Sequence, residues 1–231
     1  MAASEFGFAR RVHPPYPSDL SGYGLQLRPW DPALIRQMAQ WGERGFPYHM
    51  FDLGYLRDPS RASSALSWSR EESRHRHFIA VEDGAAVGRA SVNLEDDNGL
   101  YLWAVHVPPE HEGRGIARRM LATVMIWLES EAPGFDFILT TNSFAERAHR
   151  TYFALGFNTS DTRWVNDDVL TKAMWQVAPA QRKQIAAHVR FFDGRWQVRQ
   201  HLMRRLAGAQ MHVRPVVADM SPAARTTGPL R

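Results

Sequence analysis

The spacing of apolar residues changes along the middle of the chain, and each change marks a predicted strand or helix. Residues 78–81, 87–94 and 100–107 are short apolar runs. Glu82-Asp83-Gly84 joins the first run to the second, and Asn98-Gly99, a strong hairpin dipeptide, joins the second to the third. The three runs are therefore predicted to be strands in antiparallel hairpins.

Helical spacing follows these strands. One helical face is predicted from residues at i, i+3, i+4, i+7, i+10 and i+11, namely Ala117, Met120, Leu121, Val124, Trp127 and Leu128. Residues 135–140 then predict a strand. A second helix is predicted to carry Ala145, Ala148, Tyr152 and Leu155 on one face. It starts with capping-box spacing at Ser143 and ends at Gly156, a typical C′ residue.

The flanks carry weaker patterns. Residues 25–27 predict a first strand, and Asp31-Pro32 predicts the start of a helix. Alternation of apolar residues in 169–177 predicts a closing strand. Beyond Pro179, residues 185–192 and 198–206 have helical spacing on either side of Asp193-Gly194, which predicts a helical hairpin rich in arginine.

A glycine-containing loop, residues 112–117, lies between the strand ending at Val107 and the longer helix. A helix N-terminus offers unpaired N–H groups and the positive end of the helix dipole, and glycines allow close approach, so the loop suits phosphate. Gly115 is followed by Ile116-Ala117, which is not the Gly-Lys-Ser/Thr of a P-loop. The antiparallel strands upstream argue against a dinucleotide-binding βαβ unit.

Two motifs together give the chain a resemblance to the GNAT N-acetyltransferase superfamily. Segment 112–117 fits the family's pyrophosphate loop, Gln/Arg-x-x-Gly-x-Gly/Ala, after its first position. Segment 148–157 fits the second motif, Ala-x-x-x-Tyr-x-x-x-Gly-Phe, in full. The resemblance covers about residues 24–177. It implies an α/β fold with a mixed, mostly antiparallel sheet flanked by helices, to which the predicted helical hairpin would be a C-terminal extension.

The resemblance also implies acetyl-CoA as the cosubstrate. In the family, the thioester and pantetheine bind along a strand backbone, and the pyrophosphate binds the glycine loop. The cofactor-binding residues expected on this basis are Val105, His106, Val107, Gly113, Arg114, Gly115, Ile116, Ala117, Arg118 and Asn142. Tyr152 is expected to be catalytic, because the family's tyrosine protonates the departing thiolate and a phenol of pKa about 10 holds that proton at neutral pH. Without the motif, Tyr152 would be interpreted as a core residue.

Two positions depart from the family pattern. Glu112 stands where the family has Gln or Arg, and we expect its side chain to point away from the pyrophosphate. Ala145 stands where relatives often carry asparagine, and the nearest asparagine is Asn142. The role of Asn142 beside the pantetheine arm is therefore an expectation without an exact motif match.

The acceptor side is less well defined. By a period of two, Tyr101, Trp103, Val105 and Val107 share one strand face, on which many relatives carry a catalytic Glu or His. No carboxylate stands there. The incoming ammonium would lose its proton through water to Glu95, Asp96 or Asp97, or to His49, although a solvated turn is the alternative for the acidic run. Acceptor contacts are expected from Tyr48, His49, Glu95, Tyr101 and Trp103.

Composition limits the remaining classes of function. Of the 231 residues 44% are hydrophobic, enough for a sizeable core, and none is cysteine, which excludes disulfides and thiolate metal sites. His75 and His77 are too few for a metal site, and no metal is expected. No apolar run approaches the roughly 18 residues of a membrane helix, and a signal-peptide core is missing. A cytoplasmic protein without membrane contact is expected.

Charge is concentrated near the end of the chain. The net charge is +4, yet residues 178–231 hold ten Lys and Arg against two Asp, so the preceding part is acidic. We interpret the basic part as a solvated hairpin that packs on the core or on a second subunit. Nucleic-acid binding and docking of an acidic protein are the alternatives.

These patterns divide the chain into a flexible N-terminal arm (1–23), an acetyltransferase domain (24–177), a basic helical extension (178–213) and a disordered tail (214–231). The predicted function is acetyl transfer from acetyl-CoA to a primary amine of a small molecule or peptide, by direct attack in a ternary complex. One alternative is a noncatalytic acyl-CoA-binding or regulatory module. Another is an RNA- or protein-directed acetyltransferase that docks through the basic part. A homodimer is compatible with either, and the sequence does not identify the acceptor.

Overall fold

The computed structural model describes residues 14–15, 17, 20–71, 74–96, 99–131 and 133–213. The predicted tail at 214–231, most of the predicted arm, and Asp97 and Asn98 lie outside these residues. The end of the arm needs a correction. Leu20–Gly22 forms a strand that pairs with the next one, because Leu20 is apolar and is buried in the core opposite Leu27.

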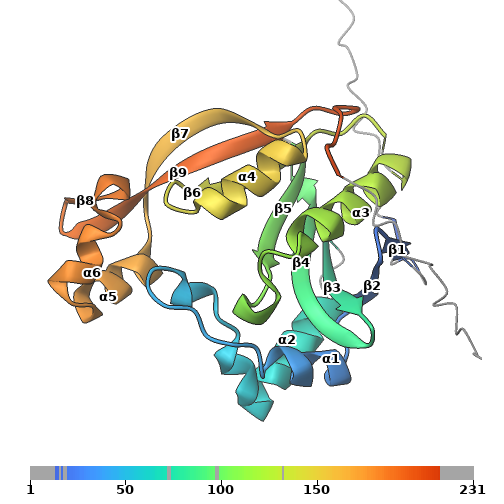
Figure 1. Cartoon of the computed structure of the whole chain (residues 1–231), viewed down its shortest axis with the longest axis horizontal. Coiled ribbons are helices and arrows are strands. Elements are labelled where there is room, and N and C mark those ends of the chain that lie inside the picture. Colours follow the sequence, from blue (N-terminus) through green and yellow to red (C-terminus); the bar gives the residue numbers. More distant parts are fainter. Residues whose placement is uncertain are drawn as a thin grey trace, which may run out of the picture.

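Nine strands form one twisted sheet within the described residues (Figure 1). They are β1 (Leu20–Gly22), β2 (Leu25–Pro29), β3 (His75–Glu82), β4 (Ala85–Asp96), β5 (Gly99–His106), β6 (Phe137–Asn142), β7 (Asn158–Asn166), β8 (Val189–Phe192) and β9 (Arg195–Arg205). Their order is β1-β2-β3-β4-β5-β6-β9-β7, and β8 pairs with β9. Only the β5–β6 pair is parallel among these strands. The prediction of a mixed, mostly antiparallel sheet is confirmed.

Helices cover both faces of this sheet (Figure 1). The α-helices are α1 (Pro32–Met38), α2 (Pro59–Glu71), α3 (Ile116–Glu131), α4 (Glu146–Ala154), α5 (Asp168–Gln176) and α6 (Pro179–Lys183). Short 3-10 helices are η1 (Tyr48–Phe51), η2 (Gly54–Arg57), η3 (Pro109–His111) and η4 (Ala186–His188). Helices α3 and α4 pack on one face, whereas α1, η2 and α2 pack on the other. None of the described helices is long and apolar enough to cross a membrane.

The apolar face predicted for α3 is confirmed. Met120, Leu121 and Val124 are fully buried in the larger core cluster. Successive residues of a strand point to opposite faces of the sheet. Phe78 therefore belongs to this cluster, whereas its neighbour Ile79 belongs to the cluster under α1. The order of strand, loop and α3 therefore places the glycine loop at the edge of a rigid core.

The predicted closing strand at 169–177 is wrong, because this segment is helix α5. Its buried residues, Leu170, Ala173 and Met174, stand at i, i+3 and i+4, which is helical spacing. Val169 and Trp175, which suggested alternation, are more than half exposed. Asp167 caps the helix by accepting a hydrogen bond from the Leu170 N–H, an N-cap signal that outweighs the apparent alternation.

The predicted helical hairpin within 178–213 is also wrong over residues 189–205, where β8 and β9 form a β-hairpin. Asp193 and Gly194 both have positive φ and form its turn, a conformation typical of Asp-Gly between antiparallel strands. Strand β9 lies between β6 and β7, so it belongs to the sheet interior. Only α6 and η4 are helical in this part of the described chain.

Candidate active site

Strands β5 and β6 separate after a short parallel contact. They pair only at Leu100 with Phe137 and at Tyr101 with Ile138, although β5 continues to His106 and β6 to Asn142. On the other side of β5, Ala104 has a φ of 50°. Arg89 of β4 pairs with His106 and Ser91 pairs with Trp103, so two residues along β4 correspond to three along β5. This irregularity is a β-bulge. The backbone of β5 beyond Tyr101 is therefore not used by β6, as the family resemblance implies.

The bulge changes which side chains share a face of β5. Val107 lies in the core under α3 and Val105 packs against that core. His106 instead stacks on Trp41 near α1, with ring centroids 5.3 Å apart. Trp103 contacts Trp68 of α2 on the same side of the sheet. The prediction that Tyr101, Trp103, Val105 and Val107 share one face is wrong, because the extra residue at the bulge inverts the alternation.

The glycine loop has the local geometry that its glycines require. Gly113 has a φ of 77° and Gly115 a φ of 72°, in the left-handed region that favours glycine. Helix α3 starts at Ile116, and the Arg119 N–H donates to the Gly115 carbonyl. The N–H groups of the first helical turn, which includes Ala117 and Arg118, have no carbonyl partner inside the helix. The loop and helix thus present backbone donors next to the open side of β5.

The three arginines around this loop differ in their partners. Arg114 pairs with Glu82 and also contacts His111, at 2.9 Å. Arg119 pairs with the same Glu82 at 3.0 Å and donates to the Tyr23 carbonyl. Arg118 has no ion pair within the described residues, and its Nη2 lies 3.9 Å from the position of a Cβ on Gly115. Arg118 is therefore the loop arginine best placed for a phosphate.

Glu112 is neutralised by two arginines from other elements. Its Oε1 lies 3.1 Å from Nη2 of Arg44, which precedes η1, and its Oε2 pairs with Arg147 of α4. Arg44 also donates to the Val107 carbonyl at the end of β5. The acidic residue at the first position of the motif thus carries compensating positive charge on both sides.

Tyr152 lies on α4 and is buried, with 8% of its surface exposed. Its ring packs edge-on against Phe157 at 6.0 Å. Burial, together with nearby Tyr101, raises the pKa of the Tyr152 phenol well above its usual value of 10. The phenol therefore keeps its proton throughout the neutral range. The Tyr101 hydroxyl is 2.6 Å from Thr140 Oγ1 and bridges β5 and β6 just beyond their last paired residues.

The other predicted site residues lie apart. Asn142 is buried at the end of β6, and its Oδ1 accepts a hydrogen bond from Gln200 Nε2 at 3.0 Å. Tyr48 of η1 donates from its hydroxyl to the Phe144 carbonyl at 3.1 Å, and His49 follows it. Glu95 is a residue of β4, but its side chain is outside the described part of the structure. No ring contact or hydrogen bond joins Tyr48 or His49 to Trp103 within the described residues.

Several residues near β5 were missed by the sequence patterns. His77, only 1% exposed, has its Nδ1 2.8 Å from Ser91 Oγ, and burial lowers the pKa of His77 to about 3. Its ring lies 5.7 Å from that of Trp103. The alternation of His75 and His77 in β3 was the available signal, but it looks like a polar strand start. Within the described residues, no group of His, Asp and Glu is arranged to hold a metal ion.

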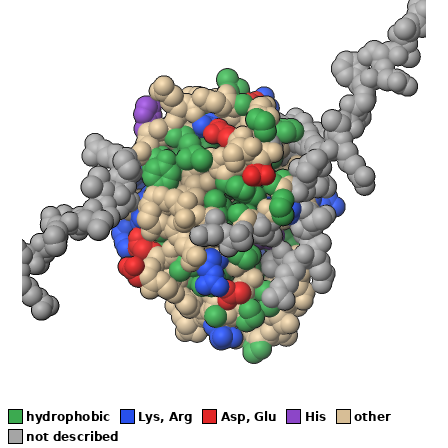
Figure 2. All heavy atoms as spheres, turned by 90° about the vertical axis from the view of Figure 1, so that its right-hand side faces the viewer, with side chains coloured by type: hydrophobic (Ala, Val, Ile, Leu, Met, Phe, Trp, Pro, Cys, Tyr) green, Lys and Arg blue, Asp and Glu red, His purple; other side chains and the backbone are tan. Residues whose placement is uncertain are grey.

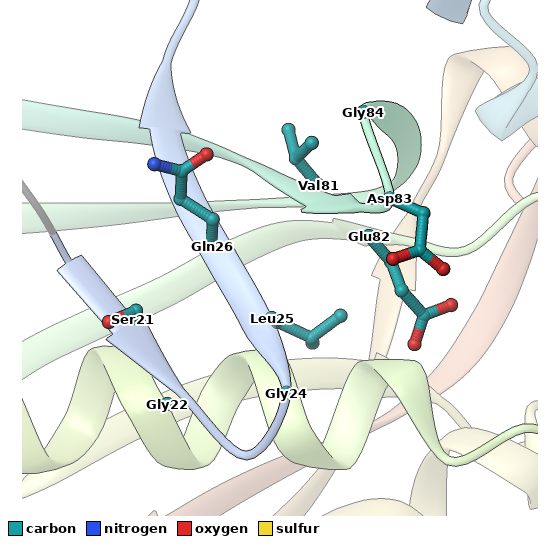
Figure 3. Close-up of a pocket in the computed structure, with 9 residues that line it drawn as sticks. All are labelled: Ser21, Gly22, Gly24, Leu25, Gln26, Val81, Glu82, Asp83 and Gly84. Atoms are coloured by element: carbon teal, nitrogen blue, oxygen red, sulfur yellow. The ribbon is translucent and has the colours of Figure 1, made fainter. Parts of the chain in front are cut away.

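A shallow hollow of about 480 Å³ lies at the far edge, between the β1–β2 and β3–β4 turns (Figure 3). In this view Glu82 points from the end of β3 toward α3. Its carboxylate forms the ion pairs with Arg114 and Arg119. None of the predicted site residues lines the hollow. The hollow therefore adjoins the glycine loop only through Glu82 and is separate from the opening between β5 and β6.

Comparison with family models decides the classification. Residues 35–157, more than half of the chain, match the model of the Acetyltransferase (GNAT) family. The chain belongs to the GNAT acetyltransferase family. The match spans both the glycine loop and the Tyr152 motif, so the elements that carry the resemblance in sequence are those described above. No curated protein matches the chain significantly in sequence.

Solved GNAT structures share this fold at low identity. A chimera of spermidine N-acetyltransferase SpeG from Vibrio cholerae and hSSAT is 14% identical, with a TM-score of 0.56 over 79% of this chain and 95% of that one. The Vibrio cholerae spermidine N-acetyltransferase in complex with CoA and spermine is 14% identical, with a TM-score of 0.54 over 80% of this chain and 97% of that one. The Escherichia coli ribosomal-protein-S18-alanine N-acetyltransferase is 15% identical, with a TM-score of 0.50 over 82% of this chain and 99% of that one.

The share of this chain that aligns with these structures indicates that the common fold continues beyond Val177. Residues 24–177 make up two thirds of the chain, whereas the aligned part is about four fifths of it. The shared fold must therefore include residues outside 24–177. We infer that β9 is part of the GNAT fold here, which agrees with its place between β6 and β7.

Proposed function

We propose that this GNAT protein transfers an acetyl group from acetyl-CoA to a primary amine, by direct attack in a ternary complex. The observation that carries the proposal is the opening between β5 and β6, with the glycine loop of α3 on one side and Tyr152 of α4 on the other. This arrangement supports binding of a long thioester along the free backbone of β5.

Acetyl-CoA would be held mainly by backbone groups. The N–H groups of 113–118 and the positive end of α3 suit the pyrophosphate, and the guanidinium of Arg118 supplies a cation without a competing carboxylate in the described residues. Backbone N–H groups of 105–107 would polarise the thioester carbonyl. The Vibrio cholerae spermidine N-acetyltransferase was solved with CoA bound, which supports the same cofactor class here.

The chemistry follows from these groups. The amine nitrogen attacks the thioester carbon, and the developing oxyanion is stabilised by β5 N–H groups near the bulge. A C–N bond forms as the C–S bond breaks, and Tyr152 gives its proton to the leaving thiolate. The nitrogen, positively charged after attack, releases its second proton to water, and this proton restores the Tyr152 phenol. The ammonium must first lose a proton. We propose water leading to Glu95, Asp96, Asp97 or His49, because β5, which carries Tyr101 and Trp103, contains no carboxylate of its own.

A release assay for CoA across amino acids, peptides, polyamines and aminoglycosides tests this proposal. We expect CoA release that depends on one class of amine, together with the acetylated product by mass spectrometry. Tight acetyl-CoA binding without release from any amine would instead favour the noncatalytic acyl-CoA-binding alternative.

The structure gives little support to docking through the basic part. Five of its ten basic residues lie in the β8–β9 hairpin, and Arg205 is buried in an ion pair with Glu129. Figure 2 shows the opposite end of the molecule from α6 and β8, and on that face Lys and Arg side chains are interspersed with Asp and Glu. A small molecule or peptide stays the acceptor class that we propose, and docking of RNA through the exposed Arg190, Arg195 and Arg199 is the alternative.

A further inference from the structure

Arg89 of β4 lies beside the bulge of β5. Its partner in the β4–β5 register is His106, and the next paired residue along β4, Ser91, is opposite Trp103. Residues two apart on a strand share a face, so Arg89 and Ser91 are on the side of Trp103 and His106. This side faces α1, η2 and α2, away from α3. Arg89 thus flanks the point where the thioester carbonyl would sit.

The guanidinium of Arg89 lacks a counter-charge. No carboxylate within the described residues pairs with it, and its Nε is a buried donor without a hydrogen bond. Its contacts are a side-chain hydrogen bond with Tyr55 of η2 and the face of the Trp30 ring, 5.7 Å from Cζ. Close packing lowers the pKa of Arg89 by desolvation, yet part of the residue remains accessible to solvent. A desolvated cation without an anion is costly unless a ligand supplies one.

The groups around Arg89 are hydrogen-bond donors and aromatic rings. Nε1 of Trp30 and Nε1 of Trp103 are also buried without a hydrogen-bond partner. An indole N–H only donates, so these atoms need an acceptor. Trp103 contacts Trp68 at 5.8 Å and His77 at 5.7 Å, and His77 contacts Trp30 at the same distance. The face therefore offers one cation, unpaired donors and aromatic surface.

We propose that the acceptor amine also carries a carboxylate, as an amino acid with an aromatic or large apolar side chain does, and that Arg89 binds this carboxylate. This inference rests on the proposed acetyl transfer. Arginine binds carboxylates through paired N–H donors, and Trp103 would pack against the side chain of the acceptor. A polycationic amine would meet the positive charge of Arg89 here. The likeness to spermidine N-acetyltransferases is thus one of fold.

Matched pairs of acceptors test the proposal with the full chain. L-phenylalanine is compared with phenethylamine and L-tryptophan with tryptamine, with spermidine as a third class. We expect kcat/KM for the amino acids to exceed that for their decarboxylated partners by about 100-fold, the effect of one buried charge-assisted pair. Acetylation of spermidine or of the decarboxylated amines, without acetylation of the amino acids, overturns the proposal while leaving acetyl transfer intact. No acetylation of any amine removes the proposed function itself.

Variants locate the effect. Arg89→Met is expected to lower kcat/KM for the amino acids about 100-fold and to change acetyl-CoA affinity less than twofold. Arg89→Lys, which keeps the charge, restores part of the loss and covers the case in which Arg89→Met does not fold. Arg163→Met, an exposed arginine of β7, is the matched control and is expected to change nothing. Equal losses for amino acids and decarboxylated amines in both Arg89 variants would make Arg89 structural and overturn the proposal.

Discussion

The two faces of the sheet at β5, called here the two sides of β5, draw their residues from the sequence in different ways. On the side of α3, the cofactor region is nearly continuous in sequence, because β5, the loop and the first turn of α3 follow one another. On the other side, the acceptor region draws single residues from far apart: Trp30 before α1, Tyr55 of η2, Trp68 of α2, Arg89 of β4 and Trp103 of β5. A backbone site leaves a motif, whereas a side-chain site assembled by packing leaves none.

Charge separates the two sides as well. Near the loop, Glu82 and Glu112 each hold two arginines, so most of the positive charge there is already paired. Arg89 on the acceptor side has the Tyr55 phenol as its side-chain hydrogen-bond partner and the Trp30 indole as its cation–π partner, and no carboxylate among the described residues pairs with it. The cofactor side can rely on helix N–H groups for an anion, but the acceptor side has one guanidinium for that purpose. Tests that affect one side and spare the other will sharpen this difference.

The largest effect is expected from removal of β9. A chain ending at Val177 would expose the edge of β6 and leave β7 without its partner, since β9 pairs with both. We expect this chain to be unfolded by circular dichroism and unable to bind acetyl-CoA. A chain ending at Val213 keeps β9 and is the control, with cooperative melting expected. Native-like melting of the shorter chain would restore the boundary at 177 that the sequence predicted.

That boundary shows where sequence patterns fail. The hairpins, α3, the glycine loop and the helix with Tyr152 were predicted because their signals are local, such as Asn98-Gly99 and the i, i+3, i+4 spacing. Strand β9 was not, because Val198, Leu202 and Leu206, the last of which follows the strand, stand four apart and its pairing partners are distant. The Asp193-Gly194 turn was the local signal for a β-hairpin.

The site was predicted in the same uneven way. Gly113, Gly115 and Tyr152 lie on the elements that the motifs predicted, beside the open part of β5. The faces of β5 were assigned wrongly, because a bulge depends on contacts with β4 that the alternation of residues does not record. Arg89 carried no sequence signal, since an arginine in a strand is ordinarily solvated.

Tyr152→Phe tests the cofactor side at the chemical step. Removing one hydroxyl should leave acetyl-CoA affinity nearly unchanged and lower kcat by about 10²–10⁴, as for loss of a general acid. Burial raises the pKa of Tyr152, so the wild-type phenol stays protonated well into the alkaline range. A thiol of pKa about 8.5 leaves unaided as thiolate at high pH, so the defect should shrink between about pH 7 and 9.5.

The control for this variant is Tyr23→Phe, which alters a tyrosine that packs against the same core but lies outside the site. Its kcat should equal that of the wild type. A Tyr152→Phe enzyme with full kcat would make Tyr152 a core residue, and water would then be the acid.

The pH dependence of stability tests the acceptor side. Burial lowers the pKa of His77 from 6.5 to about 3, so the folded state holds this ring neutral. The unfolded state binds a proton first as pH falls, so the stability associated with neutral His77 is complete above about pH 6.5 and is lost on acidification. Between pH 7 and 5 the free energy of unfolding should fall by about 2 kcal/mol from this group alone.

Urea unfolding of His77→Gln at both pH values isolates this contribution. The drop between pH 7 and 5 should be about 2 kcal/mol smaller in the variant than in the wild type. His212→Gln, at an exposed position, should show the wild-type drop. An identical drop in His77→Gln would mean that the pKa of His77 is the same in the folded and unfolded states, so that burial does not hold this ring neutral.

The smallest effect is expected from Gly115→Asp, which changes the loop alone. A Cβ at Gly115 meets only the flexible end of Arg118, but the added carboxylate would stand where a phosphate must approach. The positive φ also strains any side chain, so a matched control is needed. Gly134→Asp has a similar φ, 88° against 72°, and open space around its Cβ, but it follows the far end of α3. By calorimetry, acetyl-CoA affinity should fall at least about tenfold, or 1.4 kcal/mol, in Gly115→Asp only. If both variants fold and bind alike, the pyrophosphate does not lie on this loop, and the separation of the two sides of β5 loses its basis.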